Sequence, residues 1–183
     1  TEMKLLLFLA PGFEEIEAVT VLDIVRRAGL SIKSVSIGDN KTVIGAHQIS
    51  IQADLTFDEV NFDEAEALIL PGGMPGTNNL NAHAGLKKQL VIFARDPDKT
   101  VAAICAAPLI LGDLGLLDGK KATCYPGFES HLSKAKLSRK PVVRDGNIIT
   151  ADGPAHALLF AIKLVEFLGN TFLADDITKS LNF

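Results

Sequence analysis

Short, almost entirely apolar runs recur along this 183-residue chain, and Pro, Gly or other small residues follow each of them. The clearest runs cover residues 4–10, 65–70 and 100–105. A strand that is apolar throughout is typical of a parallel sheet covered on both faces, because neither face meets water. Residues 14–28 instead have apolar positions at helical spacing, with acidic residues in the first turn and arginines in the last. This alternation predicts strand–helix–strand units.

The same criteria place the other elements. We expect further strands at residues 30–37, 122–125, 142–143 and 147–150, and a small hairpin from residues 41–44 and 47–52. Further helices are expected at residues 81–95, 107–117, 154–168 and 173–181. Neither a linker nor an internal repeat interrupts the pattern. The chain is therefore predicted to be a single α/β domain over residues 1–183, a three-layer sandwich around a mostly parallel sheet.

Charge and hydropathy exclude several classes of protein. The 18 Lys and Arg against 22 Asp and Glu give a net charge of −4, which argues against a nucleic-acid-binding module. The longest apolar run, residues 5–11, is far shorter than the roughly 20 residues of a membrane span, and no basic segment precedes it as in a signal peptide. Two cysteines in such a chain indicate a reducing compartment. We expect a soluble cytoplasmic protein.

Cys105 is the strongest candidate for chemistry. It follows a buried strand, and the small residues Ala103, Ala106 and Ala107 surround it, as in the tight strand-to-helix turn of a nucleophile elbow. The helix expected after it would direct backbone N–H groups, beginning near Ala106, at the sulfur and favour the thiolate. The alternative is a buried cysteine that merely ends an apolar strand.

Two other strand ends share the rim where ligands collect in an open parallel sheet. Glu14 and Glu15 are best interpreted as solvated partners of the helix dipole, whereas Glu17 lies on a stripe that is not plainly polar and is positioned to share a proton with Cys105. Gly72 and Gly73 follow another strand. They are either only a turn or a source of bare N–H groups for a developing oxyanion.

Other candidates are weaker. No two histidines have metal-ligand spacing, so we predict no zinc site from His47, His83, His131 and His156. Cys124 is either a resolving thiol for Cys105 or, more simply, a core residue. Residues 71–76 lack the pattern of a phosphate loop or a dinucleotide fingerprint, so no cofactor is expected.

Four motifs together resemble the ThiJ/PfpI superfamily, and within it the branch of the Parkinson-disease protein and bacterial YajL. They are Ala10-Pro-Gly-Phe-Glu-Glu-Ile-Glu17, Leu70-Pro-Gly-Gly73, Ala102-Ala-Ile-Cys-Ala-Ala-Pro108 and Gly153-Pro154. The similarity runs in the same order from residue 4 to the C-terminal helix. It implies a flavodoxin-like sandwich of the class I glutamine amidotransferase type, a homodimer and no cofactor.

The resemblance also implies roles for individual residues. Cys105 corresponds to the family's reactive cysteine, and Glu17 to a carboxylic acid that stays protonated and donates a hydrogen bond to the thiolate. Gly72 and Gly73 correspond to the oxyanion glycines. Tyr125 stands where members of this branch often have a histidine, and Ala106 where protease-like members have one. A peptidase is therefore not expected.

These residues favour an enzyme that converts 2-oxoaldehydes, free or as early adducts on proteins, into 2-hydroxy acids. Phe13, Tyr125 and Pro126 are the expected pocket residues. The alternative is a redox-responsive, stress-protective or chaperone-like protein that senses oxidation through Cys105, since both functions need an accessible thiolate. We expect the pKa of Cys105 to lie below that of a free cysteine, and helix 14–28 to contribute Ile16, Val19, Thr20 and Ile24 to a dimer interface.

Overall fold

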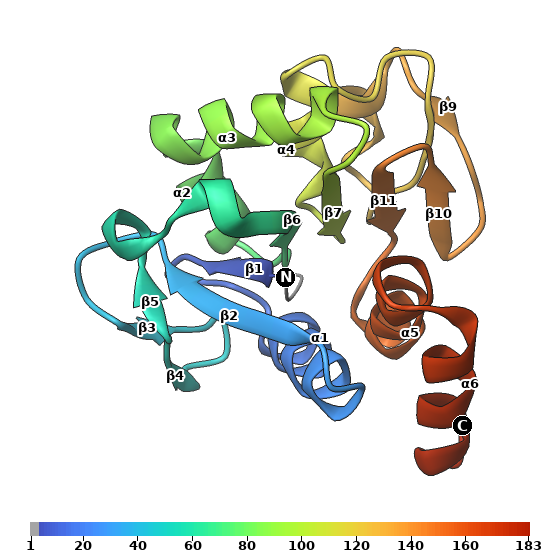
Figure 1. The fold of residues 1–183 in the computed structure, drawn as a ribbon. Coiled ribbons are helices and arrows are strands. Elements are labelled where there is room, and N and C mark those ends of the chain that lie inside the picture. The colour runs from blue at the N-terminus through green and yellow to red at the C-terminus, as the bar shows by residue number, and fades with distance from the viewer. Residues whose placement is uncertain (1–3) are drawn as a thin grey trace.

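The computed structural model describes residues 4–183 and contains a seven-stranded sheet in the order β10-β11-β7-β6-β1-β2-β5 (Figure 1). All neighbouring strands are parallel except β10, which runs antiparallel to β11 at one edge. The strands are β1 (Lys4–Leu9), β2 (Ser31–Ser36), β5 (Leu55–Thr56), β6 (Ala65–Leu70), β7 (Thr100–Ile104), β10 (Val142–Asp145) and β11 (Ile148–Ala151). The expected mostly parallel sheet is confirmed.

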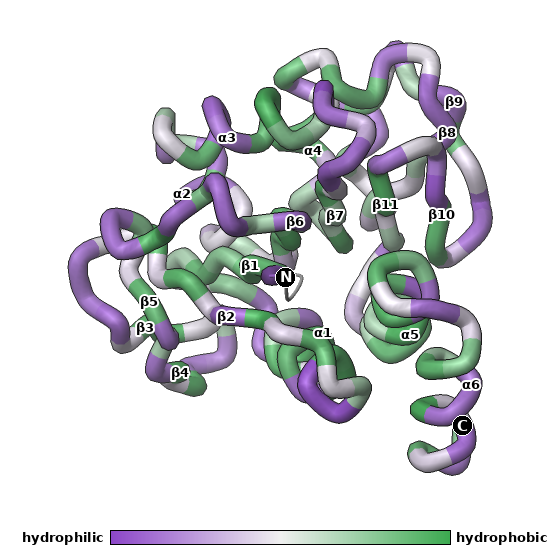
Figure 2. The backbone as a smooth tube through the Cα atoms, viewed as in Figure 1, coloured by the Kyte–Doolittle hydropathy of each residue, from purple (hydrophilic) through white to green (hydrophobic). Residues whose placement is uncertain are grey.

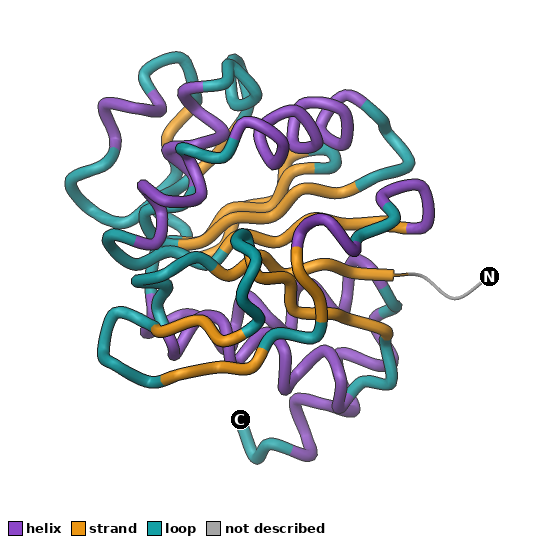
Figure 3. Tube along the Cα trace, turned by 90° about the vertical axis from the view of Figure 1, so that its left-hand side faces the viewer, coloured by secondary structure: helices purple, strands orange, loops and turns teal. Residues whose placement is uncertain are grey.

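Helices cover both faces of this sheet, and Figure 3 shows the strands between them. One face carries α1 (Glu15–Arg27) and α5 (Ala157–Leu168), which pack on each other, with α6 (Thr171–Ser180) against α5. The other face carries α2 (Gly76–Asn81), α3 (Ala84–Arg95) and α4 (Pro108–Asp113). Single 3₁₀ turns lie at η1 (Phe57–Glu59), η2 (Phe62–Glu64), η3 (Glu129–Leu132) and η4 (Pro154–His156). The three-layer α/β sandwich is thus as predicted.

Two apolar cores lie on opposite sides of the sheet. Along β1, Leu5, Leu7 and Leu9 point into one core, and Leu6 and Phe8 point into the other. This alternation is the two-residue period of a strand, and both sets are buried because helices cover both faces. In Figure 2 the same apolar character continues into α5. No helix among residues 4–183 has both the length and the apolar character of a membrane span.

The structure corrects the expected boundaries at three places. The helix expected at residues 81–95 begins later, because the side chain of His83 caps α3 by accepting a hydrogen bond from Leu86 N–H at 2.9 Å, and a separate α2 precedes it. Helix α4 ends at Asp113 instead of residue 117. The strand expected at residues 122–125 is only β8 (Lys121–Ala122), which pairs with β9 (Lys136–Leu137) outside the main sheet.

The predicted hairpin is present as β3 (Thr42–Ile44) and β4 (Ser50–Gln52). It lies outside the main sheet, and the turn between its strands approaches the N-terminus of α1. There Glu15 accepts hydrogen bonds from the backbone N–H groups of His47 and Ile49, at 2.8 and 3.2 Å. A segment more than 30 residues along the chain therefore lies beside the first turn of α1.

Candidate active site

Cys105 follows β7 directly, in a left-handed backbone conformation with φ of 67°. This conformation costs a non-glycine residue of the order of 1–3 kcal/mol and persists only where the surroundings hold it. Two hydrogen bonds hold Cys105 in this conformation. Cys105 N–H donates to the carbonyl of Ala151 at 2.9 Å, and Tyr125 N–H donates to the carbonyl of Cys105 at 2.8 Å. The strained turn expected from the small residues around the cysteine is therefore present.

Glu17 lies in the first turn of α1, with 0% of its surface exposed. Its Oε1 accepts a hydrogen bond from Gly72 N–H at 2.8 Å, whereas its Oε2 is buried with no hydrogen-bond partner among residues 4–183. The carboxyl lies within hydrogen-bonding reach of the Cys105 thiol. One oxygen of this carboxyl is therefore held by the backbone, and the other lies in a dry environment without a donor among the described residues.

Gly72 brings the two side chains together. A Cβ atom at this position would lie 2.6 Å from Cys105 Cβ and 2.9 Å from Glu17 Oε1, closer than real contacts allow. The first glycine after β6 thus lets the thiol and the carboxyl approach the same backbone segment. Its N–H is already bonded to Glu17, which differs from the expectation that it faces a developing oxyanion.

Two other backbone N–H groups are directed at the sulfur. They belong to Gly73 and Ala106, and both act to lower the pKa of the Cys105 thiol. Gly73 has φ of 89°, and a Cβ there would lie 2.5 Å from the backbone nitrogen of Glu14, so only glycine fits. The donors available to an oxyanion or an oxidised sulfur are therefore those of Gly73 and Ala106.

Burial dominates the electrostatics of the pair. It raises the pKa of Glu17 to about 7, against the opposing hydrogen bonds from Gly72 and the thiol. Burial also raises the pKa of Cys105 to about 12, and the charge of Glu17 beside it adds to the effect. The prediction of an acidic thiol is wrong in direction, because the residue is only 8% exposed and its neighbour is a carboxylate.

These two groups titrate as a unit because they are in contact. Between pH about 7 and about 12 they hold one proton and one negative charge. The proton can sit on the sulfur or on the carboxyl without any change in the net charge of the site. The arrangement is therefore suited to moving a proton between a nucleophilic sulfur and a buried carboxyl.

The expected pocket residues divide into two groups. Tyr125 and Pro126 are exposed, and the Tyr125 ring packs against Gly153, where an added Cβ atom would lie 3.1 Å from Tyr125 Cδ2. Phe13 is instead fully buried in the core between the sheet and α1, so it does not line an open pocket. Cys124 belongs to the opposite apolar core from Cys105, which argues against a resolving thiol.

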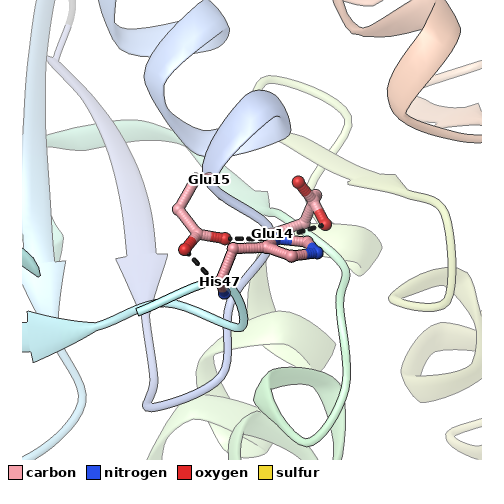
Figure 4. Close-up of side chains that lie close together, drawn as sticks. All are labelled: Glu14, Glu15 and His47. Atoms are coloured by element: carbon pink, nitrogen blue, oxygen red, sulfur yellow. Dashed lines mark hydrogen bonds and ion pairs between the residues drawn. The ribbon is translucent and has the colours of Figure 1, made fainter. Parts of the chain in front are cut away.

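One cluster near the site was not predicted from the sequence. His47 lies against Glu14 and Glu15 at the start of α1 (Figure 4). The hydrogen bond to Glu15 and the charges of both carboxylates raise the pKa of His47. Glu14 and Glu15 are buried rather than solvated, contrary to expectation. No local spacing signals this cluster, because 32 residues separate Glu15 from His47.

Comparison with known proteins identifies the family. Residues 3–167 match the model of the DJ-1/PfpI family. The protein dj-1beta of Drosophila melanogaster is 33% identical over 178 residues, which cover 96% of this chain and 95% of that protein. The deglycase PH1704 of Pyrococcus horikoshii is 35% identical, over 91% of this chain and 99% of its own. The glutathione-independent glyoxalase DJ-1 of Schizosaccharomyces pombe is 31% identical, over 98% of each chain.

Solved structures agree with these relatives. The crystal structure of Drosophila melanogaster DJ-1beta superposes with a TM-score of 0.94 at 32% identity, covering 99% of this chain and 98% of that one. Oxidised Toxoplasma gondii DJ-1 superposes with a TM-score of 0.92 at 34% identity, again covering 99% and 98%. The sequence match, the shared fold and the motifs around Cys105 and Glu17 lead to one conclusion: the chain belongs to the DJ-1/PfpI family.

Proposed function

We propose that this protein converts 2-oxoaldehydes such as methylglyoxal, free or as early adducts on proteins, into 2-hydroxy acids without a cofactor. The observation that carries the proposal is the contact between the strained Cys105 and the buried Glu17 across Gly72. Relatives named glyoxalase and deglycase support the same class of substrate.

The first step is addition of sulfur to the aldehyde. The Cys105 proton passes to Glu17 as the sulfur attacks the aldehyde carbon, and Glu17 then delivers the same proton to the carbonyl oxygen, which gives a hemithioacetal and leaves Glu17 as a carboxylate. A base with a pKa of about 7 is suited to this transfer, because catalysis is most effective when the base titrates near the working pH. We expect the N–H groups of Gly73 and Ala106, which are directed at the sulfur, to stabilise the transient oxyanion.

The second step moves hydrogen between the two substrate carbons. Glu17 removes the proton from the carbon bound to sulfur and returns it to the neighbouring carbonyl carbon, through an enediol. The product is a thioester of the 2-hydroxy acid on Cys105. Water then cleaves the C–S bond, releases the acid and restores the thiol. The aldehyde carbon is oxidised and its neighbour is reduced, so no external oxidant is required.

Peptide cleavage is a poorer match to this site. An amide is a weaker electrophile than an aldehyde, and its amine leaving group needs a proton donor. Protease-like members of the superfamily that the sequence resembles have a histidine where this chain has Ala106, and Glu17 is fully buried.

The test is conversion of methylglyoxal to lactate by the purified chain. Cys105→Ala is expected to abolish turnover, and Glu17→Gln to slow it by roughly 100-fold or more, the usual contribution of a positioned acid or base. Cys124→Ala is the matched control, because this second free cysteine lies in the opposite core. Turnover by Cys105→Ala or Glu17→Gln as fast as wild type would exclude the proposal.

A second candidate function is oxidation sensing through Cys105. It is favoured by the N–H groups of Gly73 and Ala106, which can donate to sulfinate oxygens, and it is opposed by burial, which raises the pKa of the thiol and leaves a thiolate only when Glu17 takes the proton. Peroxide treatment followed by intact and peptide mass measurement tests it. A gain of two oxygens on Cys105 before Cys124 supports the sensor, and an unmodified Cys105 argues against it. Either function requires a reduced thiol, so we place the protein in the cytoplasm.

We also propose that the chain forms a homodimer through the start of α1 and the β3–β4 hairpin. Ile16, Val19, Ile44 and Ile49 are half-exposed, and the hydrogen bonds from the hairpin to Glu15 hold these two segments together. An exposed group of apolar residues of this kind is typical of an interaction surface. Ile24, expected on the same surface, is instead buried in the core.

A further inference from the structure

Three potential ligand atoms converge where the hairpin meets the start of α1. One atom each from Glu14, Glu15 and His47 lies within 4.8 Å of the others. His47 Nδ1 is 3.0 Å from Glu15 Oε1 and 3.7 Å from Glu14 Oε2. Figure 4 shows the imidazole lying between the two carboxylates. The cluster is separate from the thiol and from Glu17.

The charges in this cluster are not balanced. Glu14 and Glu15 are only 8% and 6% exposed, and buried carboxylates are costly unless they are paired. Among residues 4–183, His47 is the one cationic side chain that pairs with either of them, so a single positive charge faces two negative ones.

Of the two carboxylates, Glu14 has fewer hydrogen-bond donors. Glu15 accepts from the N–H groups of His47 and Ile49 as well as facing the imidazole. Glu14 Oε1 accepts from Ile16 N–H at 3.2 Å, but Oε2 accepts no hydrogen bond from any residue the structure describes, and it faces His47. The Glu14 side chain is 11% exposed, and its Oε2 reaches solvent 3.7 Å from His47 Nδ1. Two carboxylates and an imidazole therefore converge on a point that a cation and its water ligands can reach.

The geometry suits a small divalent ion. With metal–ligand distances of about 2.0–2.2 Å, two ligands of a tetrahedral zinc ion lie about 3.4 Å apart. The distances of 3.0 and 3.7 Å from His47 to the two carboxylates bracket that value. One imidazole and two carboxylates form a mixed nitrogen and oxygen set, which favours zinc over calcium or magnesium. We propose that Glu14, Glu15 and His47 bind one Zn²⁺, with water completing the coordination.

Such an ion would link the hairpin to the backbone segments that position the active-site residues. Glu14 N–H donates to the carbonyl of Gly72 at 2.9 Å, so the first turn of α1 is already attached to the loop that separates Cys105 from Glu17. Zinc would attach the hairpin to the same turn. The site would then have a positioning role, and it does not depend on the reaction proposed above.

Calorimetric titration of the whole chain with Zn²⁺ tests the proposal. We expect one ion per chain, and affinity lower by roughly tenfold or more in both His47→Ala and Glu14→Gln, since even partners outside the ligand shell contribute this much. The His47 side chain is exposed and its loss leaves the core intact, so the variant is expected to fold. His131→Ala is the matched control, because His131 pairs with one carboxylate, Asp113, at 2.8 Å.

Titration with Co²⁺ distinguishes this site from the two thiols. Cobalt bound at the proposed site shows visible d–d bands without a thiolate-to-cobalt charge-transfer band. The proposal is overturned if His47→Ala binds zinc as tightly as wild type, if His131→Ala loses as much affinity as His47→Ala, or if all bound cobalt has thiolate ligands. A loss confined to His47→Ala and Glu14→Gln supports it whether or not the chain acts on methylglyoxal.

Discussion

Replacing Glu17 by Gln is expected to stabilise the fold at alkaline pH while removing activity. The unfolded chain releases the Glu17 proton near pH 4.5, but the native chain keeps it until about pH 7 because the carboxyl is buried. The unfolded state therefore binds fewer protons between these values, and native stability falls as the pH rises. Gln has the same shape and no charge, so the free energy of unfolding of Glu17→Gln should not fall in this way as the pH rises.

The size of the effect follows from the shift. A rise in pKa from 4.5 to about 7, at 1.36 kcal/mol per unit, corresponds to roughly 3 kcal/mol lost by the wild type on ionisation. The free energy of unfolding of Glu17→Gln, minus that of wild type, should rise by this amount between pH 4.5 and 8. The rise is the same whether the charge then sits on Glu17 or on Cys105, because the pair releases one proton in either case.

Urea unfolding of both proteins across this pH range is the assay, with a chelator present so that Glu14 and Glu15 carry no metal. Glu15→Gln is the matched control, since it removes a carboxylate from the same helical turn. Burial acts to raise the pKa of Glu15, but its backbone hydrogen bonds and the bond to His47 lower it overall. The stabilisation by that carboxylate is lost only as the pH falls below 4.5, and its pair with His47 is lost only as the imidazole deprotonates above pH 6.5. The control difference should therefore stay flat between pH 4.5 and 6, where the difference for Glu17→Gln already rises.

A flat difference for Glu17→Gln across the range would refute the reasoning. It would mean that the native carboxyl ionises as easily as the unfolded one, and that Glu17 is not held in the dry environment described here. A rise of the same size in Glu15→Gln between pH 4.5 and 6 would show that the trend belongs to the whole helix terminus and not to Glu17.

Three further predictions concern packing, strain and assembly. Gly72→Ala should lose most activity and about 1–3 kcal/mol of stability, because its Cβ would lie 2.6 Å from Cys105 Cβ. Gly38→Ala, with nothing within 4 Å, should be neutral in the same urea and lactate assays. Cys105→Gly should be about 1 kcal/mol more stable to urea than Cys105→Ala, since glycine relieves the positive φ; equal stability would remove the argument for strain. In sedimentation, Ile16→Glu and Val19→Glu should reduce a dimer to 19.5 kDa, and a wild type already at that mass would exclude the dimer.

Much of the fold is predictable because burial on both faces leaves a plain signal. β1, β6 and β7 are almost continuously apolar, and only a sheet covered twice tolerates such strands. The short elements β5 and β9 have no comparable pattern. Each has two residues, and their pairing with β2 and β8 depends on where the chain returns in space.

The candidate site was predictable in composition but not in electrostatics. Parallel strands end at one edge, so the residues after β6 and β7 are expected to meet, and Gly72 and Cys105 do. The sign of the thiol pKa shift depends on how much water reaches the sulfur, which no residue spacing reveals. The expected helix N-terminus contributes through Ala106, yet burial outweighs it.

The His47 cluster shows the same limit at longer range. Glu14 and Glu15 follow the pattern of solvated residues in a first helical turn, and His47 lies in the turn of a hairpin, between Ala46 and Gln48. Only the folding of the hairpin onto α1 brings His47 beside these two adjacent carboxylates.

The central claim, that Cys105 and Glu17 act as one proton-sharing unit, is tested most directly by the pH dependence of methylglyoxal turnover. The wild-type kcat/KM for lactate formation should rise as the pH passes through about 7, where the pair loses its first proton, and then level off. Cys105→Ala should show no turnover, and Glu17→Gln should be slow and lack this rise. A Glu17→Gln enzyme that keeps the wild-type profile, or a Cys105→Ala enzyme that keeps the wild-type rate, would contradict the account.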